Sequence, residues 1–321
     1  MGGKKLKILV TGAGGPAGVG TIKALMHSYS VVAVDSNNLA PGLYLANQAY
    51  VVPNADDPTF IPKILKICRK NNVSLVIPTV SEELLPFSQN IGLFQKKGVT
   101  VAVSGPESIE VANNKLKTYG FFKGESFCPE VYSAQEPKFP CVVKPIESRG
   151  SRGFYICENM EDLKVALEKN VHSGYQSVVM ELLKGVEFSV YGLSDLGGKP
   201  LVCVINKRIR AVGESKVAKI VLSLEIEDLA FEMARKLKLV GPWNIQLMGR
   251  KGFFKLVEVN PRVAGSLSLV EASGLHYIDL MIKIFTDKKI QPYELQYHPG
   301  IIMTRYNEEL FLNPDAVLPV A

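Results

Sequence analysis

Four polar side chains between residues 246 and 262 have the types and spacing of a phosphoryl-transfer site. Glu258 and Asn260 alternate on one face of an expected strand, and Arg262 follows directly after Pro261. Carboxylate and amide oxygens are ligands that Mg²⁺ prefers, and Gln246, on the other arm of an expected hairpin, can face them. A guanidinium beside such a metal neutralises charge on a transferring phosphoryl group. The pattern indicates a metal site of Gln246, Glu258 and Asn260, with Arg262 as a catalytic group.

Two lysines and a loop earlier in the chain are suited to binding phosphates. Lys144 ends an apolar run, and a lysine at the end of a buried strand is costly unless it meets an anion. Lys115 lies 29 residues earlier. The small-residue loop that follows Lys144 can fold its backbone N–H groups over phosphates, and its residues are Gly150, Ser151, Arg152 and Gly153.

A short linker with an acid at each end follows the next expected strand. It begins Glu181, Leu182, Leu183 and ends at Glu187. A linker backbone can present one N–H and one C=O to an adenine edge, and Glu187 can accept hydrogen bonds from ribose hydroxyls. Taken singly, each of these features also has a structural explanation, since a strand-ending lysine is more often a surface side chain with its head in water.

The start of the chain carries a different signal. Residues 12–17 fit the pattern G-x-G-x-x-G/A between an expected strand and an expected helix, and Asp35 ends the next strand, 23 residues after Gly12. Such a loop lets the backbone approach a pyrophosphate, and the acid can hold a ribose. An NAD(P)-dependent oxidoreductase that uses Gly12, Gly14 and Asp35 is therefore an alternative, although no Tyr-x-x-x-Lys, Ser or His arrangement accompanies it in a plausible position.

The elements that position these residues follow from apolar periodicity. Up to about residue 105, β-branched runs alternate with amphipathic segments, which predicts a parallel α/β sheet covered on both faces. Beyond it, glycine turns near 197–198 and 249–252 predict antiparallel hairpins. We expect strands at 8–10, 31–34, 49–52, 75–77, 99–103, 141–144, 154–157, 177–182, 188–193 and 201–206, a hairpin over 245–259, and helices at 18–27, 60–70, 82–96, 160–169, 226–237 and 267–285.

Composition narrows the class of protein. The chain has 321 residues and a net charge of +6 that is not gathered into one stripe, which argues against a nucleic-acid partner. No apolar run approaches ~18 residues, so no membrane span is expected, and residues 6–10 predict a first strand rather than a signal peptide. The five cysteines and four histidines are dispersed, which favours reduced thiols, a cytoplasmic location and no zinc site. A homodimer is the commonest assembly of soluble enzymes.

The chain resembles the ATP-grasp superfamily in the order and spacing of these features. They are the two lysines, the small-residue loop, the linker and the segment Glu258-x-Asn260-Pro261-Arg262. The Asn-Pro-Arg ending, together with Arg208-x-Arg210-x-x-Gly213-Glu214-Ser215, resembles most closely the carbamoyl-phosphate synthetase large-chain branch and the amino-acid ligases similar to it. The resemblance implies a Rossmann-like α/β domain over residues 1–105, followed by a two-lobed ATP-grasp fold. Its small lobe would cover 106–183, and its large lobe, with the metal site, 184–321.

The resemblance also implies a chemistry. Such enzymes use ATP with Mg²⁺, or Mn²⁺ in its place, to phosphorylate a small-molecule carboxylate, and an amine or ammonia then attacks the acyl phosphate, releasing ADP and phosphate. It implies that Lys144 and Arg262 stabilise the transferring phosphoryl group. Arg208 or Arg210 would hold a phosphate or the substrate carboxylate, and we expect Arg210 in this role. A non-catalytic ATP-binding sensor on the same fold remains a further alternative.

Overall fold

The N-terminal part of the chain forms a five-stranded parallel sheet. The computed structural model describes residues 6–147 and 152–319. The strand order is β3-β2-β1-β4-β5, so the order reverses beside β1. At such a reversal the loops that leave the strand ends separate and form a crevice. The strands are β1 (Lys7–Val10), β2 (Ser30–Asp35), β3 (Gln48–Val51), β4 (Leu75–Ile77) and β5 (Thr100–Val101).

Helices cover this sheet on both faces, as the continuous apolar strands require. The expected helix over 82–96 is two helices that meet at Asn90. The Asn90 side chain donates a hydrogen bond to the Pro86 carbonyl, 2.8 Å away, which offers the backbone an alternative to a continuing helix. The helices are α1 (Pro16–Leu25), the 3₁₀ turn η1 (Pro41–Tyr44), α2 (Phe60–Asn71), α3 (Ser81–Gln89) and α4 (Ile91–Gln95).

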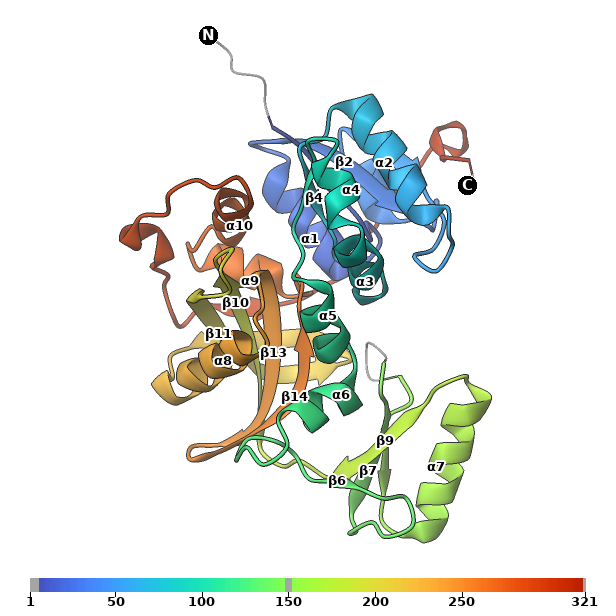
Figure 1. Ribbon diagram of the computed structural model, residues 1–321, viewed down its shortest axis with the longest axis vertical. Coiled ribbons are helices and arrows are strands. Elements are labelled where there is room, and N and C mark those ends of the chain that lie inside the picture. Colours follow the sequence, from blue (N-terminus) through green and yellow to red (C-terminus); the bar gives the residue numbers. More distant parts are fainter. Residues whose placement is uncertain (1–5, 148–151, 320–321) are drawn as a thin grey trace.

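A four-stranded antiparallel sheet with one helix forms a small lobe that projects at the lower right of Figure 1. Its strand order is β6-β9-β7-β8. Helix α7 (Met160–His172) packs Leu163 and Ala166 against Cys141 and Val143 of the sheet. The strands are β6 (Val131–Tyr132), β7 (Cys141–Pro145), β8 (Tyr155–Cys157) and β9 (Ser177–Glu181).

A six-stranded antiparallel sheet forms the body of the molecule, with strand order β14-β13-β10-β11-β12-β15. The expected hairpins are present, and β12 and β15 add to them beyond what apolar patterning predicted. The strands are β10 (Val186–Ser194), β11 (Pro200–Val212), β12 (Glu214–Val221), β13 (Gly241–Arg250), β14 (Phe253–Asn260) and β15 (Ile302–Thr304).

The helices around this sheet include one further break. The expected helix over 267–285 is divided into α9 (Leu267–Ala272) and α10 (Tyr277–Phe285), because Gly274 between them takes a left-handed conformation with φ +87°. Two helices absent from the sequence prediction, α5 (Pro106–Asn113) and α6 (Lys115–Phe121), contact β14. The remaining elements are α8 (Leu224–Lys236), η2 (Pro292–Leu295) and η3 (Pro314–Ala316). The domain boundaries at 105 and 183 stay a prediction.

The two faces of the six-stranded sheet have different partners. One face packs Val190, Ile205 and Ile245 against Ile226 and Met233 of α8. The opposite face is divided along the strands. Its apolar half carries Leu193, Val204 and Ile220 and belongs to the same core as α9 and α10. Its polar half carries the expected site residues of β10, β11, β13 and β14.

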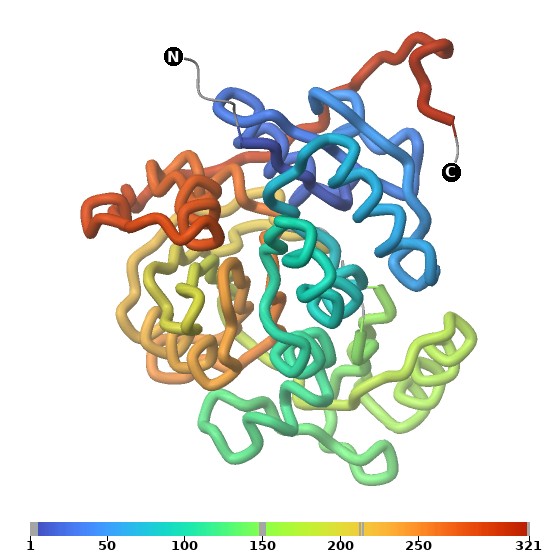
Figure 2. The backbone as a smooth tube through the Cα atoms, turned by 45° about the horizontal axis from the view of Figure 1, so that its top comes forward, coloured from blue at the N-terminus to red at the C-terminus, as the bar shows by residue number. Residues whose placement is uncertain are grey.

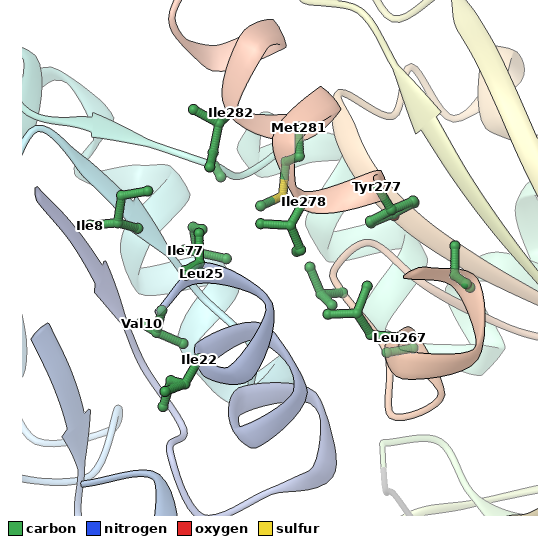
Figure 3. Packing of buried hydrophobic residues seen from close by; sticks show 14 of the residues in the cluster. Ile8, Val10, Ile22, Leu25, Ile77, Leu267, Tyr277, Ile278, Met281 and Ile282 are labelled. Atoms are coloured by element: carbon green, nitrogen blue, oxygen red, sulfur yellow. The ribbon is translucent and has the colours of Figure 1, made fainter. Parts of the chain in front are cut away.

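A shared apolar core joins the parallel sheet to the helices of the body. Ile22 and Leu25 of α1 belong to the same buried cluster as Ile278 and Met281 of α10, and Figure 3 shows part of this cluster between the parallel sheet and α10. The last segment of the chain returns along the N-terminal domain, as Figure 2 shows, where Asn38 Nδ2 donates to the Leu318 carbonyl at 2.9 Å. The N-terminal domain is thereby held against the body from two directions. Among the described residues, no helix combines the length and apolarity needed to cross a membrane.

Candidate active site

A cleft of about 1230 Å³ lies between the N-terminal domain and the polar half of the six-stranded sheet. The loops after β1, β2 and β4 line one side of it, and strands β10, β11, β13 and β14 line the other. Four of the expected site residues lie on its surface together: Gln246, Glu258, Asn260 and Arg262. The reversal of strand order in the parallel sheet accounts for the position of the cleft, since the loops after β1 and β4 diverge there.

Strand register brings the expected metal ligands together. Gln246 of β13 lies opposite Glu258 of β14, and Asn260 continues the same face. Asn260 Nδ2 donates to Glu258 Oε1 at 3.0 Å. The three side chains supply carboxylate and amide oxygens, which fit Mg²⁺. The set contains one carboxylate, and the described residues hold no group of three or more His, Cys, Asp or Glu side chains placed to share a metal.

Glu258 is held as a carboxylate by the cations around it. Burial opposes its ionisation, but Lys115, the hydrogen bond from Asn260, Lys144 and Arg262 together lower the pKa of Glu258 below its usual range. Lys115 Nζ lies 3.4 Å from Glu258 Oε2, and its side chain is 10% exposed. Glu258, with a side chain that is 25% exposed, lines the cleft, whereas Lys115 does not.

Lys144 is buried and does not line the cleft, and its charge is weakly compensated. Its Nζ donates to the Val257 carbonyl at 3.2 Å and lies 5.3 Å from the centre of the Tyr119 ring. Tyr119 Oη donates to the same carbonyl at 2.6 Å. Burial and then the neighbouring Lys115 lower the pKa of Lys144 to about 7, against the opposing charges of Glu258 and Glu187. An ammonium in this position gains strongly from an incoming anion.

Arg262 connects the body to the N-terminal domain. Its Nε donates to Ser81 Oγ at 2.9 Å, and its Nη1 to the Val263 carbonyl at 2.9 Å. Its Nη2 donates to Asn260 Oδ1 at 3.2 Å. A guanidinium fixed on three sides keeps its charge at one place in the cleft, beside the Glu258 and Asn260 pair.

The linker acids are each engaged by a neighbouring group. Glu181 Oε1 accepts a hydrogen bond from the Glu130 backbone at 2.8 Å and lies 3.7 Å from Lys255 Nζ. Glu187 forms an ion pair with Arg208. Burial raises the pKa of Glu187, while Arg208 acts in the opposite direction. Between the two acids, Leu182 and Leu183 are half-buried against the core of the body.

Of the remaining expected residues, some line the cleft and others do not. Gly150 and Ser151 lie outside the described residues, whereas Arg152 lines the cleft and Gly153, with φ +67°, accepts a hydrogen bond from Asn170. Arg210 is exposed and does not line the cleft. The register of β11 against β12 shifts between Arg208 and Arg210, so the simple two-residue alternation that would put both on one face is broken there.

The glycine loop after β1 is bonded to its own domain. Gly14 N–H donates to Asp35 Oδ2 at 2.7 Å, and Asn37 N–H donates to Asp35 Oδ1 at 2.9 Å. Gly12 has φ +61°, and a Cβ there would lie 2.2 Å from Cγ2 of Val80. The glycine pattern and Asp35 thus have a structural explanation that needs no dinucleotide.

Several residues in or near the site were given no role from the sequence. Ser81 accepts from Arg262, and Tyr119, expected to be core, is buried but also supplies the hydroxyl at the Val257 carbonyl. Ser189 and Asn244 line the cleft, and Asn244 Nδ2 donates to Ser189 Oγ at 2.8 Å. A usable signal existed for the last two, since by alternation Ser189 shares a strand face with Glu187 and Asn244 shares one with Gln246.

Two family models match the chain. The model for the PylC-like N-terminal domain matches residues 8–102, and the model described as ATP-grasp in the biosynthetic pathway with Ter operon matches residues 175–309. Residues 8–102 therefore match a PylC-like N-terminal domain, and residues 175–309 match an ATP-grasp domain. The expected fold class and the resemblance to the ATP-grasp superfamily are confirmed.

Curated relatives are distant. The chain is 28% identical over 176 residues to formate-dependent phosphoribosylglycinamide formyltransferase from Bacillus subtilis, which covers 52% of this chain and 45% of the relative. It is 25% identical over 291 residues to the carbamoyl phosphate synthase large chain of Thermoplasma acidophilum, covering 80% of this chain and 27% of the relative. The chain thus spans less than half the length of either protein.

Solved structures share the architecture at low sequence identity. Biotin carboxylase from Campylobacter jejuni, in a β,γ-ATP complex, superposes with a TM-score of 0.71 at 16% identity, covering 92% of this chain and 74% of that one. An ADP complex of N5-carboxyaminoimidazole ribonucleotide synthetase gives 0.73 at 14% identity, covering 94% and 81%. These likenesses establish the fold across nearly the whole chain.

Proposed function

We propose that this protein is an ATP-dependent ligase that joins a small-molecule carboxylate to an amine. The observation that carries the proposal is the convergence of Lys115, Lys144 and Arg262 on one carboxylate, Glu258, which lines a large cleft. Three basic side chains around a single acid can supply an excess of positive charge, because a triphosphate would favour the charged form of Lys144. The curated relatives described above support the same class of reaction, and the solved structures support the fold.

The proposed reaction has two steps. An oxygen of the substrate carboxylate attacks the γ-phosphorus of ATP, the bond to the bridging oxygen breaks, and ADP leaves. The amine nitrogen then attacks the acyl carbon, loses a proton and expels inorganic phosphate, which leaves an amide. No side-chain nucleophile is needed, and the cleft requires only groups that bind, orient and neutralise charge.

Each residue has a role that follows from its position. Lys144, buried and poorly compensated, would hold phosphate oxygens of ATP, and Arg262 would hold the transferring phosphoryl group from its fixed position beside Asn260. Gln246, Glu258 and Asn260 would hold Mg²⁺ or Mn²⁺, which supplies charge neutralisation at the phosphates when bound. The linker from Glu181 to Glu187 would bind the nucleoside. Arg208, which lines the cleft, suits a substrate or phosphate contact better than the exposed Arg210.

The loop around Arg152 and Gly153 would help to cover the phosphates, because an acyl phosphate hydrolyses if water reaches it. The substrates are then small molecules, with no nucleic-acid or membrane partner. The proposal includes a cytoplasmic location, and a homodimer is the assembly we expect for such an enzyme.

The test is a phosphate-release screen of carboxylates against amines with ATP and Mg²⁺, with products identified by mass spectrometry. We expect release that depends on both substrates, and its loss in Glu258→Gln and Lys144→Met. Glu107→Gln is the matched control, because Glu107 is exposed and does not line the cleft. Full turnover in both site variants would overturn the residue assignment. Tight ATP binding without phosphate release for any pair would favour a sensor.

A further inference from the structure

The small lobe reaches the cleft through an arginine. Of the described residues from β6 to β9, Arg152 alone lines the cleft. Two arginines of the large sheet region also line it, and each is held by a hydrogen bond to the protein: Arg208 to the Gly213 carbonyl and Arg262 to Ser81. Arg152 is exposed, so its position at the cleft depends on the backbone that carries it.

The residue after Arg152 has a backbone conformation that favours glycine. Gly153 has φ +67°, in the left-handed region. A Cβ at Gly153 would lie 2.4 Å from Oδ1 of Asn170 and 2.7 Å from Cγ of Pro145. The backbone next to Arg152 is therefore packed closely between the end of β7 and the last turn of α7.

The side chain of Asn170 holds this backbone. Its Nδ2 donates to the Gly153 carbonyl at 2.9 Å and to Ser177 Oγ at 2.8 Å. Ser177 is the first residue of β9 and pairs with Pro145 of β7. The Asn170 backbone carbonyl accepts from the Tyr175 N–H at 2.8 Å. One amide thus joins α7, the start of β9 and the segment that precedes β8.

Asn170 occupies a position where packing alone would favour an apolar residue. It is 1% exposed and continues the buried face of α7 that begins with Leu163 and Ala166. Asparagine is a poor helix former, and a buried amide costs free energy unless it is hydrogen-bonded. An apolar residue here would leave the Gly153 carbonyl without this donor. The hydrogen bond to the backbone beside Arg152 therefore accounts for a polar residue in this core.

The beginning of the connection between β7 and β8 is also bonded to its neighbours. The N–H of Ile146 donates to the Gln176 carbonyl at 2.9 Å, and the Ile146 carbonyl accepts from the Lys115 N–H at 2.9 Å. Lys144 lies two residues before Ile146, within β7. With Gly153 held by Asn170, the position of Arg152 is set relative to both lysines of the proposed site.

We propose that Asn170 is a positioning residue of the ligase: by holding Gly153 it keeps Arg152 at the cleft, where the guanidinium contacts a phosphate of the nucleotide. The inference rests on the proposed function. Asn170 itself does not line the cleft, so it acts through Arg152 rather than on the ligand. A guanidinium binds phosphate oxygens strongly and does not recognise a nucleoside in this way. The effect of Asn170 should therefore appear only with ligands that carry phosphates.

Calorimetry on the full chain with Mg²⁺ tests this role, with ADP and adenosine as the probes. We expect Asn170→Ala to weaken ADP binding by about tenfold and to leave adenosine binding unchanged. Arg152→Met should weaken ADP binding to a similar extent, and adding Asn170→Ala to it should bring no further loss. Ser177→Ala is the matched control, because it removes the other acceptor of Asn170 and keeps the bond to Gly153. Equal weakening of ADP and adenosine, or additive losses in the double variant, would show a merely structural role.

A second variant approaches the same contact from the glycine. Gly153→Ala places a methyl group against Asn170 Oδ1, so it should also weaken ADP binding by about tenfold. Gly174→Ala is its control, since Gly174 has φ +76° in the same lobe and nothing lies within 4 Å of a Cβ there. Both variants carry the backbone strain of a left-handed alanine, but only the first disturbs Asn170. Equal ADP affinity in the two would overturn the inference, even if Asn170→Ala does not fold.

Trypsin cleavage after Arg152 provides a readout that needs no nucleotide. Measured relative to cleavage after Lys251, in the exposed turn between β13 and β14, it should be faster in Asn170→Ala and Gly153→Ala than in the unmodified protein. No acceleration in either variant would show that Asn170 does not hold this segment. If the unmodified protein does not bind ADP but cleavage is accelerated, the nucleotide assignment is wrong and the contact with Asn170 stands. If ADP binds equally to the unmodified protein and both variants, the inference is wrong and the proposed function stands.

Discussion

Lys115 Nζ lies 3.4 Å from Glu258 Oε2, and the lysine side chain has little contact with water. The lysine opens helix α6, and the glutamate stands near the end of β14, 143 residues further along the chain. Among the charges that favour ionisation of Glu258, Lys115 is the largest contributor. The lysine that the sequence associates with phosphate is thus also the group that keeps the expected metal ligand ionised.

Replacement of this lysine should affect the glutamate. Lys115→Met removes the largest favourable charge, so the pKa of Glu258 should rise, and Mg²⁺-dependent ADP binding should weaken by about tenfold or more. The loss should be greatest at low pH, where Glu258 becomes protonated. Calorimetry across pH measures both effects. Lys117→Met is the matched control on the same helix, because Lys117 is exposed and pairs with Glu110. Equal weakening in both variants would contradict the specific role of Lys115.

Glu83 should make the free energy of unfolding depend on pH. Its pKa is about 8 in the folded protein against an ordinary value of 4.5, so the folded state retains a proton that the unfolded state releases. The stabilisation is complete below about pH 4.5 and is lost as pH rises through about 8, at no more than about 1.4 kcal/mol per pH unit. Glu83→Gln should flatten this slope in urea unfolding between about pH 5 and 7, a window below the opposing titration of Lys144. An unchanged slope would mean that Glu83 is ionised in the folded protein.

Gly192 should tolerate no side chain. A Cβ there would lie 2.0 Å from Cζ2 of Trp243, whose ring is held by a hydrogen bond from its Nε1 to Ser194. Gly192→Ala should lower the free energy of unfolding by at least about 1–3 kcal/mol. Gly92→Ala is the control, since nothing lies within 4 Å of a Cβ at that exposed helical position. Thermal and urea unfolding measure the difference, and equal stability of the two variants would show that the Trp243 ring can move aside.

The glycine loop should not bind a nicotinamide cofactor. Both carboxylate oxygens of Asp35 already accept backbone hydrogen bonds, one of them from Gly14. We therefore expect NADH or NADPH fluorescence titrations to give no saturable signal. Saturable binding that disappears in Asp35→Ala would instead favour the oxidoreductase alternative. Asp57→Ala is a suitable comparison, since Asp57 lies in the same domain but does not line the cleft.

Local patterning predicted the elements well and their interruptions poorly. Buried runs such as Leu75–Ile77 appear where the sequence placed them, because continuous β-branched residues suit a sheet covered on both faces. The breaks at Asn90 and Gly274 were missed, since apolar spacing continues across both while the backbone does not. Helices α5 and α6 were missed as well, and Lys115 opens the second of them.

The site was predictable where residues are consecutive on one strand and less so where distant segments meet. Glu258 and Asn260 share a face by alternation alone. The register shift in β11 makes Arg208 and Arg210 unequal, and one chain without structure does not reveal a bulge. Ser81 could not be found from local pattern either, because its partner Arg262 lies 181 residues away and depends on how two domains dock.

Two contacts restrict which N-terminal domains can recombine with this body during evolution. They are the apolar core that α1 shares with α10 and the hydrogen bond from Arg262 to Ser81. A recombinant that received an N-terminal domain from another protein of this fold would bring a foreign surface to α10 and a foreign residue to Arg262. Crossover near residue 105 should therefore succeed only when the incoming domain supplies both a matching apolar helix and a hydroxyl at the start of α3. Inheritance of the two domains as one unit follows from this packing.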